Sequence, residues 1–215
     1  MSSNLEVQKT EPRMINKLKK RFGNKCLGLK VNYQKEFDNS PIKQIRFCEA
    51  VNDAFKTPLL FNPQNLSCYG AKRSMGILKH DEELVQHIAQ ESGIASQIIR
   101  MAVNDIPHFE SPIQNILMGI DEEMEKEVTP DMFILFISPK DVMELMKEYA
   151  LKLSQYPIIK PYTFMSVCGN VFANTYKHGV ISVSFGCPES RNYGGVKDNL
   201  MVVGIPYSVC LQIFN

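Results

Sequence analysis

Residues 132–153 read MFILFISPKDVMELMKEYALKL, and this stretch decides the fold class. The first six residues, Met132 to Ile137, are all apolar, which is typical of a strand that is buried on both faces. Ser138 and Pro139 then turn the chain directly into a helix. The apolar side of that helix carries Val142, Leu145, Met146, Tyr149 and Leu153. A strand followed at once by a covering helix predicts a domain with both kinds of element.

The same kind of patterning predicts elements on both sides of this stretch. Apolar residues at helical spacing predict helices over 14–22, 47–55, 82–92, 98–102 and 208–213. Short apolar or alternating runs predict strands over 59–61, 114–120, 180–185 and 201–203. Asp81 is the expected N-cap of the third helix, and the acidic run over 121–127 is expected to face solvent. Because helices and strands are interleaved, we predict a mixed α/β (α+β) domain rather than a bundle or a sandwich.

Composition and charge exclude several classes of protein. The chain has 215 residues, of which 44% are hydrophobic and 22% charged, and this excludes disordered, collagen-like and coiled-coil proteins. Its 24 Lys and Arg nearly balance 23 Asp and Glu. A net charge of +1 gives no long-range field that would attract nucleic acid or an anionic membrane, so neither is an expected partner.

The amino terminus and the cysteines indicate the compartment. Residues 1–13 are polar, lack the apolar run of a signal peptide, and are expected to be flexible, with a single domain over 14–215. The longest apolar stretch, 132–137, is far shorter than the ~20 residues that span a bilayer. We therefore expect a cytoplasmic protein whose six cysteines are not a disulfide framework.

A repeat is built around four of the cysteines. Residues 45–51 (IRFCEAV) can be aligned with residues 165–171 (MSVCGNV), and each segment continues as a short helix and then a strand. In each half a second cysteine follows in a turn, 20 and 19 residues after the first. We therefore predict two halves, about 40–120 and 128–215, related by a pseudo-twofold axis. A homodimer would supply the same symmetry, and this alternative stays open. The repeated cysteines are Cys48, Cys68, Cys168 and Cys187.

Four thiols that meet across such an axis form a ligand set for a metal. Thiolate is the soft ligand that iron–sulfur clusters and structural zinc prefer, so we predict that these four bind a 4Fe–4S cluster or, alternatively, zinc. One competing interpretation is that the thiols are only buried core side chains. The other is that Cys68 or Cys187 is a low-pKa thiol beside an arginine. For Cys26 and Cys210, which have no counterpart in the repeat, burial in the core is expected.

Basic residues near the second cysteine of each half are candidate ligand-binding groups. They are Arg73, Arg191, Lys72 and Lys197. Positive charge there would lower a thiol pKa, offset the charge of an anionic cluster or hold an anionic ligand. The histidines His80, His87, His108 and His178 form no catalytic motif, and the glycine-rich segment 193–197 is no nucleotide fingerprint. Whether the chain is an enzyme is left open by these patterns.

Five short segments carry a family resemblance. They are 46–51 (RFCEAV), 65–71 (NLSCYGA), 167–170 (VCGN), 186–191 (GCPESR) and 203–206 (VGIP). Together they resemble the domain-of-unknown-function family 169, a set of archaeal and bacterial proteins common in anaerobes, from about Leu27 to the end of the chain. The resemblance implies a soluble cytoplasmic protein with cysteine-bearing turns, and its anaerobic members favour an iron–sulfur cluster over zinc. Tyr69 stands where the family's turn typically has the proline that Cys187-Pro188 retains.

These observations lead to one leading hypothesis and two alternatives. The leading hypothesis is a cluster-binding or metal-binding protein whose partner is a redox protein. Its role would be in redox chemistry, sensing or cluster handling, because four cysteine ligands leave no open position on the cluster for a substrate. The first alternative is an enzyme or a small-ligand-binding protein with a low-pKa cysteine between the halves. The second is a scaffold protein with buried thiols.

Overall fold

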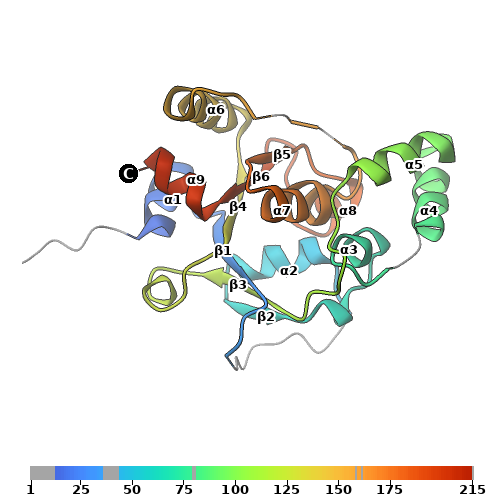
Figure 1. Cartoon of the computed structure of the whole chain (residues 1–215), viewed down its shortest axis with the longest axis horizontal. Helices are drawn as coiled ribbons and strands as arrows, with labels where there is room; N and C mark the ends of the chain where they lie inside the picture. Colours follow the sequence, from blue (N-terminus) through green and yellow to red (C-terminus); the bar gives the residue numbers. More distant parts are fainter. Residues whose placement is uncertain (1–12, 36–43, 79–80, 158, 161, 215) are drawn as a thin grey trace, which may run out of the picture.

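The computed structural model describes residues 13–35, 44–78, 81–157, 159–160 and 162–214. Residues 1–12, which are most of the segment expected to be flexible, lie outside this description. Within the described residues, six strands form one sheet in the order β2-β3-β1-β4-β6-β5, with every neighbouring pair antiparallel (Figure 1). The fold is mixed α+β, as predicted. The strands are β1 (Cys26–Val31), β2 (Leu59–Phe61), β3 (Ile116–Ile120), β4 (Met132–Ile137), β5 (Ser182–Ser184) and β6 (Met201–Pro206).

Helices cover both faces of the sheet, and β4 shows how the layers are separated (Figure 1). Because side chains alternate along a strand, Met132, Ile134 and Phe136 enter one hydrophobic core and the three residues between them enter the other. The burial of both faces explains why β4 is apolar throughout, although its sheet is antiparallel. The first core includes residues of α2 (Phe47–Ala54) and of the π-helical segment Ser166–Ala173, which α7 (Asn174–His178) contacts. The second core includes residues of α1 (Met14–Phe22), α6 (Pro139–Leu153) and α9 (Tyr207–Phe214).

The sheet has the same strand order in each half of the chain. The first half contributes the order β2-β3-β1 and the second the order β5-β6-β4, and β1 pairs with β4 in antiparallel fashion at the centre. In each half the first strand is central, the third lies beside it and the second is at the edge. This matching order is what the predicted pseudo-twofold repeat requires of the sheet, and the axis itself stays a prediction. The strand β1 begins at Cys26, ahead of the repeat boundary near residue 40 that the sequence suggests.

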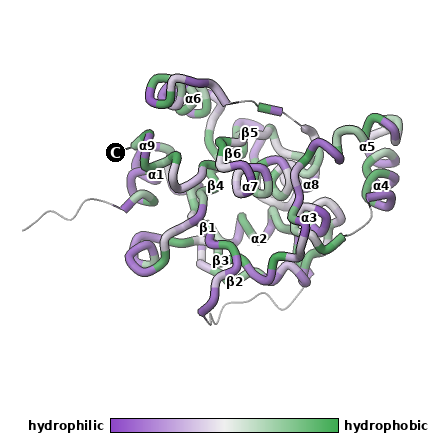
Figure 2. The backbone as a smooth tube through the Cα atoms, in the orientation of Figure 1, coloured by the Kyte–Doolittle hydropathy of each residue, from purple (hydrophilic) through white to green (hydrophobic). Residues whose placement is uncertain are grey.

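Four further helices lie near one end of the molecule. They are α3 (Tyr69–Ser74), α4 (Glu82–Ser92), α5 (Ser96–Asp105) and α8 (Pro188–Asn192). Short 3₁₀ turns occur at Pro63–Asn65 and Met124–Lys126. The helices α4 and α5 contact each other and project at the end of the molecule opposite α1 and α9 (Figure 1). Both helices are hydrophobic on some sides and hydrophilic on others, which is the pattern of helices that lie on a surface (Figure 2).

Three local predictions differ from the structure. Asp81 precedes α4, but its side chain caps no backbone N–H, because it accepts a hydrogen bond from Arg73 Nε at 2.9 Å instead. Glu125, in the acidic run expected to face solvent, is only 6% exposed. Its carboxylate accepts hydrogen bonds from the backbone N–H groups of Met14 and Ile15, the first residues of α1. The strand β1 was not predicted, since its alternation is weak and Gly28 interrupts it.

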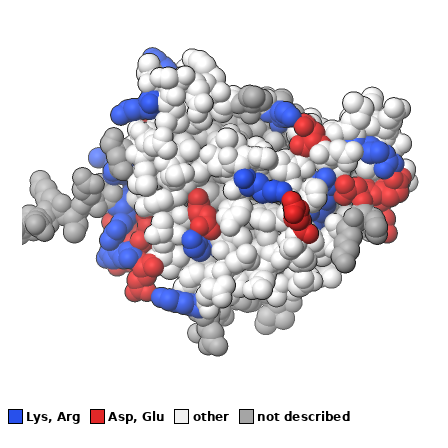
Figure 3. Space-filling view, viewed as in Figure 1, with Lys and Arg blue, Asp and Glu red and all other residues white. Residues whose placement is uncertain are grey.

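The surface matches the near-neutral composition. On the face shown in Figure 3, Lys and Arg side chains lie next to Asp and Glu, and large areas carry neither. No helix among the described residues has both the length and the apolar character needed to cross a membrane.

Candidate four-cysteine site

One cavity of about 380 Å³ brings the four repeated cysteines together. Cys48 and Cys68 come from the first half of the chain, and Cys168 and Cys187 come from the second. Three of the four are buried, and Cys68 is half-buried. Electrostatic interactions join each of the four thiols to the other three. The fold thus places all four side chains around a shared space, although their role as ligands stays a prediction.

Equivalent local structures hold the second cysteine of each half. Cys68 immediately precedes α3, and Cys187 immediately precedes α8. Both have extended backbones, with φ and ψ of −108° and 140° at Cys68 and −111° and 167° at Cys187. The first turn is thus extended like the second although Tyr69 replaces the expected proline, but only the second has a capping box, between Cys187 and Ser190.

The first cysteines lie in helices that differ between the halves. Cys48 is in the first turn of α2, an ordinary α-helix, whereas Cys168 lies in the π-helical segment. This segment begins after Met165, whose φ of 49° is in the left-handed region. The wide i→i+5 turns of a π-helix are uncommon and occur frequently at functional sites. The two helices meet through the rings of Phe47 and Phe172, whose centroids are 5.0 Å apart.

Each first cysteine is packed against a glycine from the other half. A Cβ atom on Gly194 would lie 2.6 Å from Cys48 Cβ and 3.1 Å from its Sγ. A Cβ atom on Gly70 would lie 2.8 Å from Met165 Cγ and 3.9 Å from Cys168 Sγ. Gly194 is needed for this close approach rather than for its backbone angles, because its φ is not in the left-handed region. The cavity walls are therefore formed jointly by both halves.

Burial keeps three of these thiols protonated at neutral pH. Desolvation raises the pKa of Cys48, Cys68 and Cys168 above the ordinary thiol value of 9.0, and the neighbouring cysteines raise each pKa further. Backbone N–H groups of Ala71 and Phe47 lower the pKa of Cys68, but less than burial raises it. The prediction that Cys68 is a low-pKa thiol is therefore wrong.

Of the four candidate basic residues, only Arg191 lines the cavity. Arg73 is 2% exposed and donates hydrogen bonds to Asp81 Oδ1 and to the carbonyl oxygen of Ile106, both at 2.9 Å, so it holds α3, α4 and α5 together. Lys72 lies 5.9 Å from the centre of the Tyr69 ring and is not part of the cavity wall. Lys197 is exposed. The structure thus places Arg73 in a supporting role, away from the thiols that it was expected to activate.

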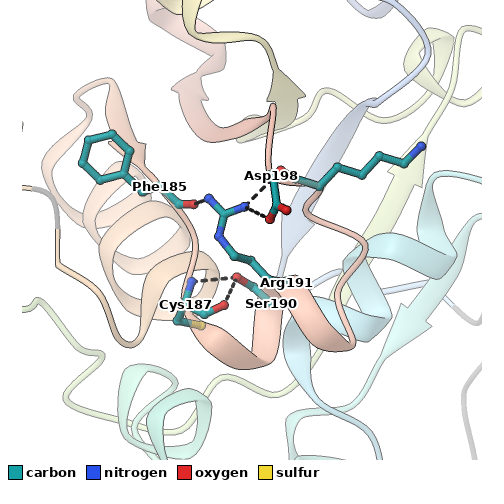
Figure 4. A network of polar contacts seen from close by, with 6 residues as sticks. Phe185, Cys187, Ser190, Arg191 and Asp198 are labelled. Atoms are coloured by element: carbon teal, nitrogen blue, oxygen red, sulfur yellow. Dashed lines mark hydrogen bonds and ion pairs between the residues drawn. The ribbon is translucent and has the colours of Figure 1, made fainter. Parts of the chain in front are cut away.

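Arg191 is held by its own loop (Figure 4). Its Nη1 donates to the carbonyl oxygen of Lys197 at 3.1 Å and to Asp198 Oδ1 at 3.3 Å, and its Nη2 donates to the carbonyl oxygen of Phe185. Beside it, Ser190 Oγ donates to the Cys187 carbonyl oxygen at 2.9 Å and accepts from the Cys187 N–H at 2.8 Å. These contacts fix the backbone around Cys187, and the ion pair with Asp198 compensates the charge of Arg191 at the cavity wall.

The structure adds cavity residues that the sequence did not single out. His87, on α4, lines the cavity, although the sequence offered no motif for it. Its ring centroid is 5.6 Å from that of Tyr69, and its Nε2 is 3.5 Å from Glu91 Oε1. The helical spacing of His87 and Glu91 was visible in the sequence, but the placement of α4 over the cysteines was not. His80 lies outside the described residues, whereas Cys26 and Cys210 are buried in the second core as expected.

A comparison with known families places the chain in one of them. The profile of the domain-of-unknown-function family 169, described as "Uncharacterised ArCR", matches residues 19–215. The chain belongs to this family. Neither the curated proteins nor the solved structures yield a match. Membership of family 169 therefore supports the resemblance drawn from the cysteine-bearing segments and leaves the chemistry to be argued from the cavity.

Proposed function

We propose that this family 169 protein binds a 4Fe–4S cluster through Cys48, Cys68, Cys168 and Cys187 and acts in electron transfer, sensing or cluster handling. The observation that carries the proposal is that four thiols from four separate segments line one cavity. A set of four cysteines is the usual ligand set of a 4Fe–4S cluster. When bound, such a cluster supplies one-electron redox chemistry.

The size of the shared cavity favours a cluster over a single ion. A zinc ion with bonds of about 2.3 Å would bring four sulfurs to within roughly 4 Å of one another. Among the described residues, no group of three or more His, Cys, Asp or Glu side chains is arranged to hold one metal ion. The proposal therefore rests on the shared cavity of about 380 Å³, part of which the four cysteines line. A polynuclear group occupies such a space better than one atom does.

Burial determines which form the thiols take before a metal binds. Burial and mutual repulsion raise the pKa of Cys48, Cys68 and Cys168, so the thiolates are unstable in the empty cavity. Bound iron ions would offset this repulsion, and the cysteine ligands would lose their thiol protons to solvent on binding. Because the ligands come from both halves of the chain, a bound cluster would also cross-link the halves and stabilise the fold.

The experiment is purification without oxygen and without a metal-binding tag, followed by a visible spectrum and assays of iron, sulfide and zinc. We expect about four iron and four sulfide per chain, as a 4Fe–4S cluster requires. Each of Cys48→Ala, Cys68→Ala, Cys168→Ala and Cys187→Ala should lose most of the iron. The matched controls are Cys26→Ala and Cys210→Ala, because both residues are buried cysteines that lie outside the cavity.

Two results would overturn the proposal. One is about one zinc per chain in place of iron and sulfide, which would indicate a structural metal site. The other is a folded protein without metal after reconstitution with iron and sulfide, or one whose iron is lost equally in the Cys26→Ala control. In the metal-free case the thiols would be buried side chains or a ligand site.

A further inference from the structure

The cavity extends beyond the four cysteines to one face of α4. Leu84, His87, Ile88, Glu91 and Ser92 all line it, and their spacing of three or four residues places them on the same side of that helix. Thr163 and Phe164 complete this wall. None of these seven residues is a cysteine, so a cluster held by the four thiols leaves them without a role.

This wall has the composition of a site for a small organic molecule. Leu84 is 1% exposed and Ile88 is 8% exposed, and both belong to the hydrophobic core that contains Cys48 and Cys168. Phe164 packs against the same core. Binding pockets for small molecules typically measure about 300–1,000 Å³ and combine apolar walls with a few polar groups. The whole cavity, cysteine side included, measures about 380 Å³ and lies within that range.

His87 is the polar group best placed to orient such a molecule. Its side chain is 43% exposed, and no hydrogen bond to its ring occurs among the described residues, although Glu91 Oε1 lies 3.5 Å from Nε2. The Tyr69 ring packs beside it. An imidazole donates a hydrogen bond from one nitrogen when it is neutral and from both when it is charged. Arg191, by contrast, already donates to three acceptors of its own loop.

We propose that the α4 side of the cavity binds a small organic molecule with an apolar body, and that His87 donates a hydrogen bond to an acceptor group at one end of it. This inference rests on the proposed function only in placing the molecule next to a cluster. Leu84, Ile88 and Phe164 enclose the apolar body, and the occupied cysteine side closes the inner end of the site. The molecule would be a substrate, an effector or an electron acceptor of this size and polarity.

The test uses the neutral dye 6-propionyl-2-dimethylaminonaphthalene, which has an apolar ring system and one carbonyl acceptor. We expect the full-length metal-free protein to bind it with a blue-shifted, enhanced emission. Ile88→Trp fills the α4 side and should weaken binding by more than about tenfold. The matched control is Ile98→Trp on α5, where the side chain is 60% exposed and outside the cavity, and it should bind like the wild type.

A second variant keeps the test decisive if Ile88→Trp does not fold. His87→Ala removes a part-exposed side chain and should weaken dye binding about threefold to tenfold while the circular dichroism spectrum is unchanged. The inference is overturned if folded Ile88→Trp binds the dye as tightly as the wild type. If Ile88→Trp is unfolded, the same result in His87→Ala overturns it. A wild type that does not bind the dye also overturns it.

Iron assays on the same preparations separate this inference from the proposed function. Ile88→Trp should weaken dye binding to the metal-free protein while it still takes up as much iron as the wild type on reconstitution. If the wild type holds no iron after reconstitution but binds dye in an Ile88-dependent way, the cluster proposal fails and the α4 site stands. If iron is present and the dye does not bind, only the α4 site fails.

Discussion

Gly194→Ala is the sharpest probe of how the two halves form the cavity. The added Cβ would lie 2.6 Å from Cys48 Cβ, 3.1 Å from Cys48 Sγ and 2.9 Å from the carbonyl oxygen of Ser190. Contacts below 3 Å cannot be accommodated without movement, and one of these is with backbone that the Ser190 side chain helps to anchor. The first turn of α2, which carries Cys48, must therefore shift away from α8.

The cost can be worked out from this overlap. Extra atoms in a packed core typically cost about 1–3 kcal/mol, and a chain of this length loses about 2–4 °C of melting temperature per kcal/mol. We therefore expect Gly194→Ala to melt roughly 2–12 °C below the wild type. The displacement should also expose the Cys48 thiol, which is 7% exposed in the native structure.

The assay is site-resolved alkylation of the metal-free protein with iodoacetamide, read by mass spectrometry, together with thermal unfolding. Cys48 should react faster in Gly194→Ala, whereas Cys26 should not. The control is Gly93→Ala, at a φ of 69° with no other atom within 4 Å of the added Cβ. Its backbone strain of about 1–2 kcal/mol lowers the melting temperature without affecting Cys48. A Gly194→Ala protein with wild-type melting and wild-type alkylation of Cys48 would refute the packing argument.

Three further predictions follow from buried groups. The pKa of Cys48, Cys68 and Cys168 is raised in the folded protein, so above pH 9 the unfolded chain loses thiol protons that the folded protein keeps. The free energy of unfolding of the metal-free protein, measured with urea, should therefore fall as the pH rises, by up to about 1.4 kcal/mol per pH unit for each thiol. The fall should be less steep in Cys48→Ala. A flat profile from pH 8 to 10.5 would contradict this. Arg73→Met should lower the free energy of unfolding by about 1–3 kcal/mol, because the carbonyl oxygen of Ile106 at the end of α5 loses its hydrogen-bond donor. Its iron content should stay at the wild-type level. Loss of iron with unchanged stability would contradict this and indicate a role in cluster binding. Glu125→Ala removes both hydrogen-bond acceptors at the start of α1 and should lower the free energy of unfolding by about 1–2 kcal/mol in the same assay. A variant as stable as the wild type would contradict this prediction.

Much of the fold could be predicted because it depends on local patterns. The strand β4 and the helix α6 have the bounds that their apolar run and the Ser138-Pro139 turn indicate. Ser138 caps α6, since its Oγ accepts a hydrogen bond from the backbone N–H of Asp141. The helix α1 also matches its prediction, because an amphipathic pattern of nine residues reports directly which side faces the core.

Predictions failed where a distant partner decides the local structure. The strand β1 contains Gly28 and lacks a clear pattern, yet it is held centrally by β3 and β4. The helix at 166–173 is π-helical, and no feature of its own sequence distinguishes it from an α-helix. Glu125 reads as one more acid in a solvated run until α1 docks on it from more than 100 residues away.

The candidate site divides in the same way. The cysteine repeat is a property of the sequence by itself, because equal spacing of 20 and 19 residues can be read without coordinates. Only the tertiary structure decided that all four thiols share one cavity, that Arg73 points into a helix junction, and that α4 brings His87 to the opposite wall. Sequence patterns determine which face of an element is apolar, whereas the neighbour that covers this face is chosen by packing between residues far apart in the chain.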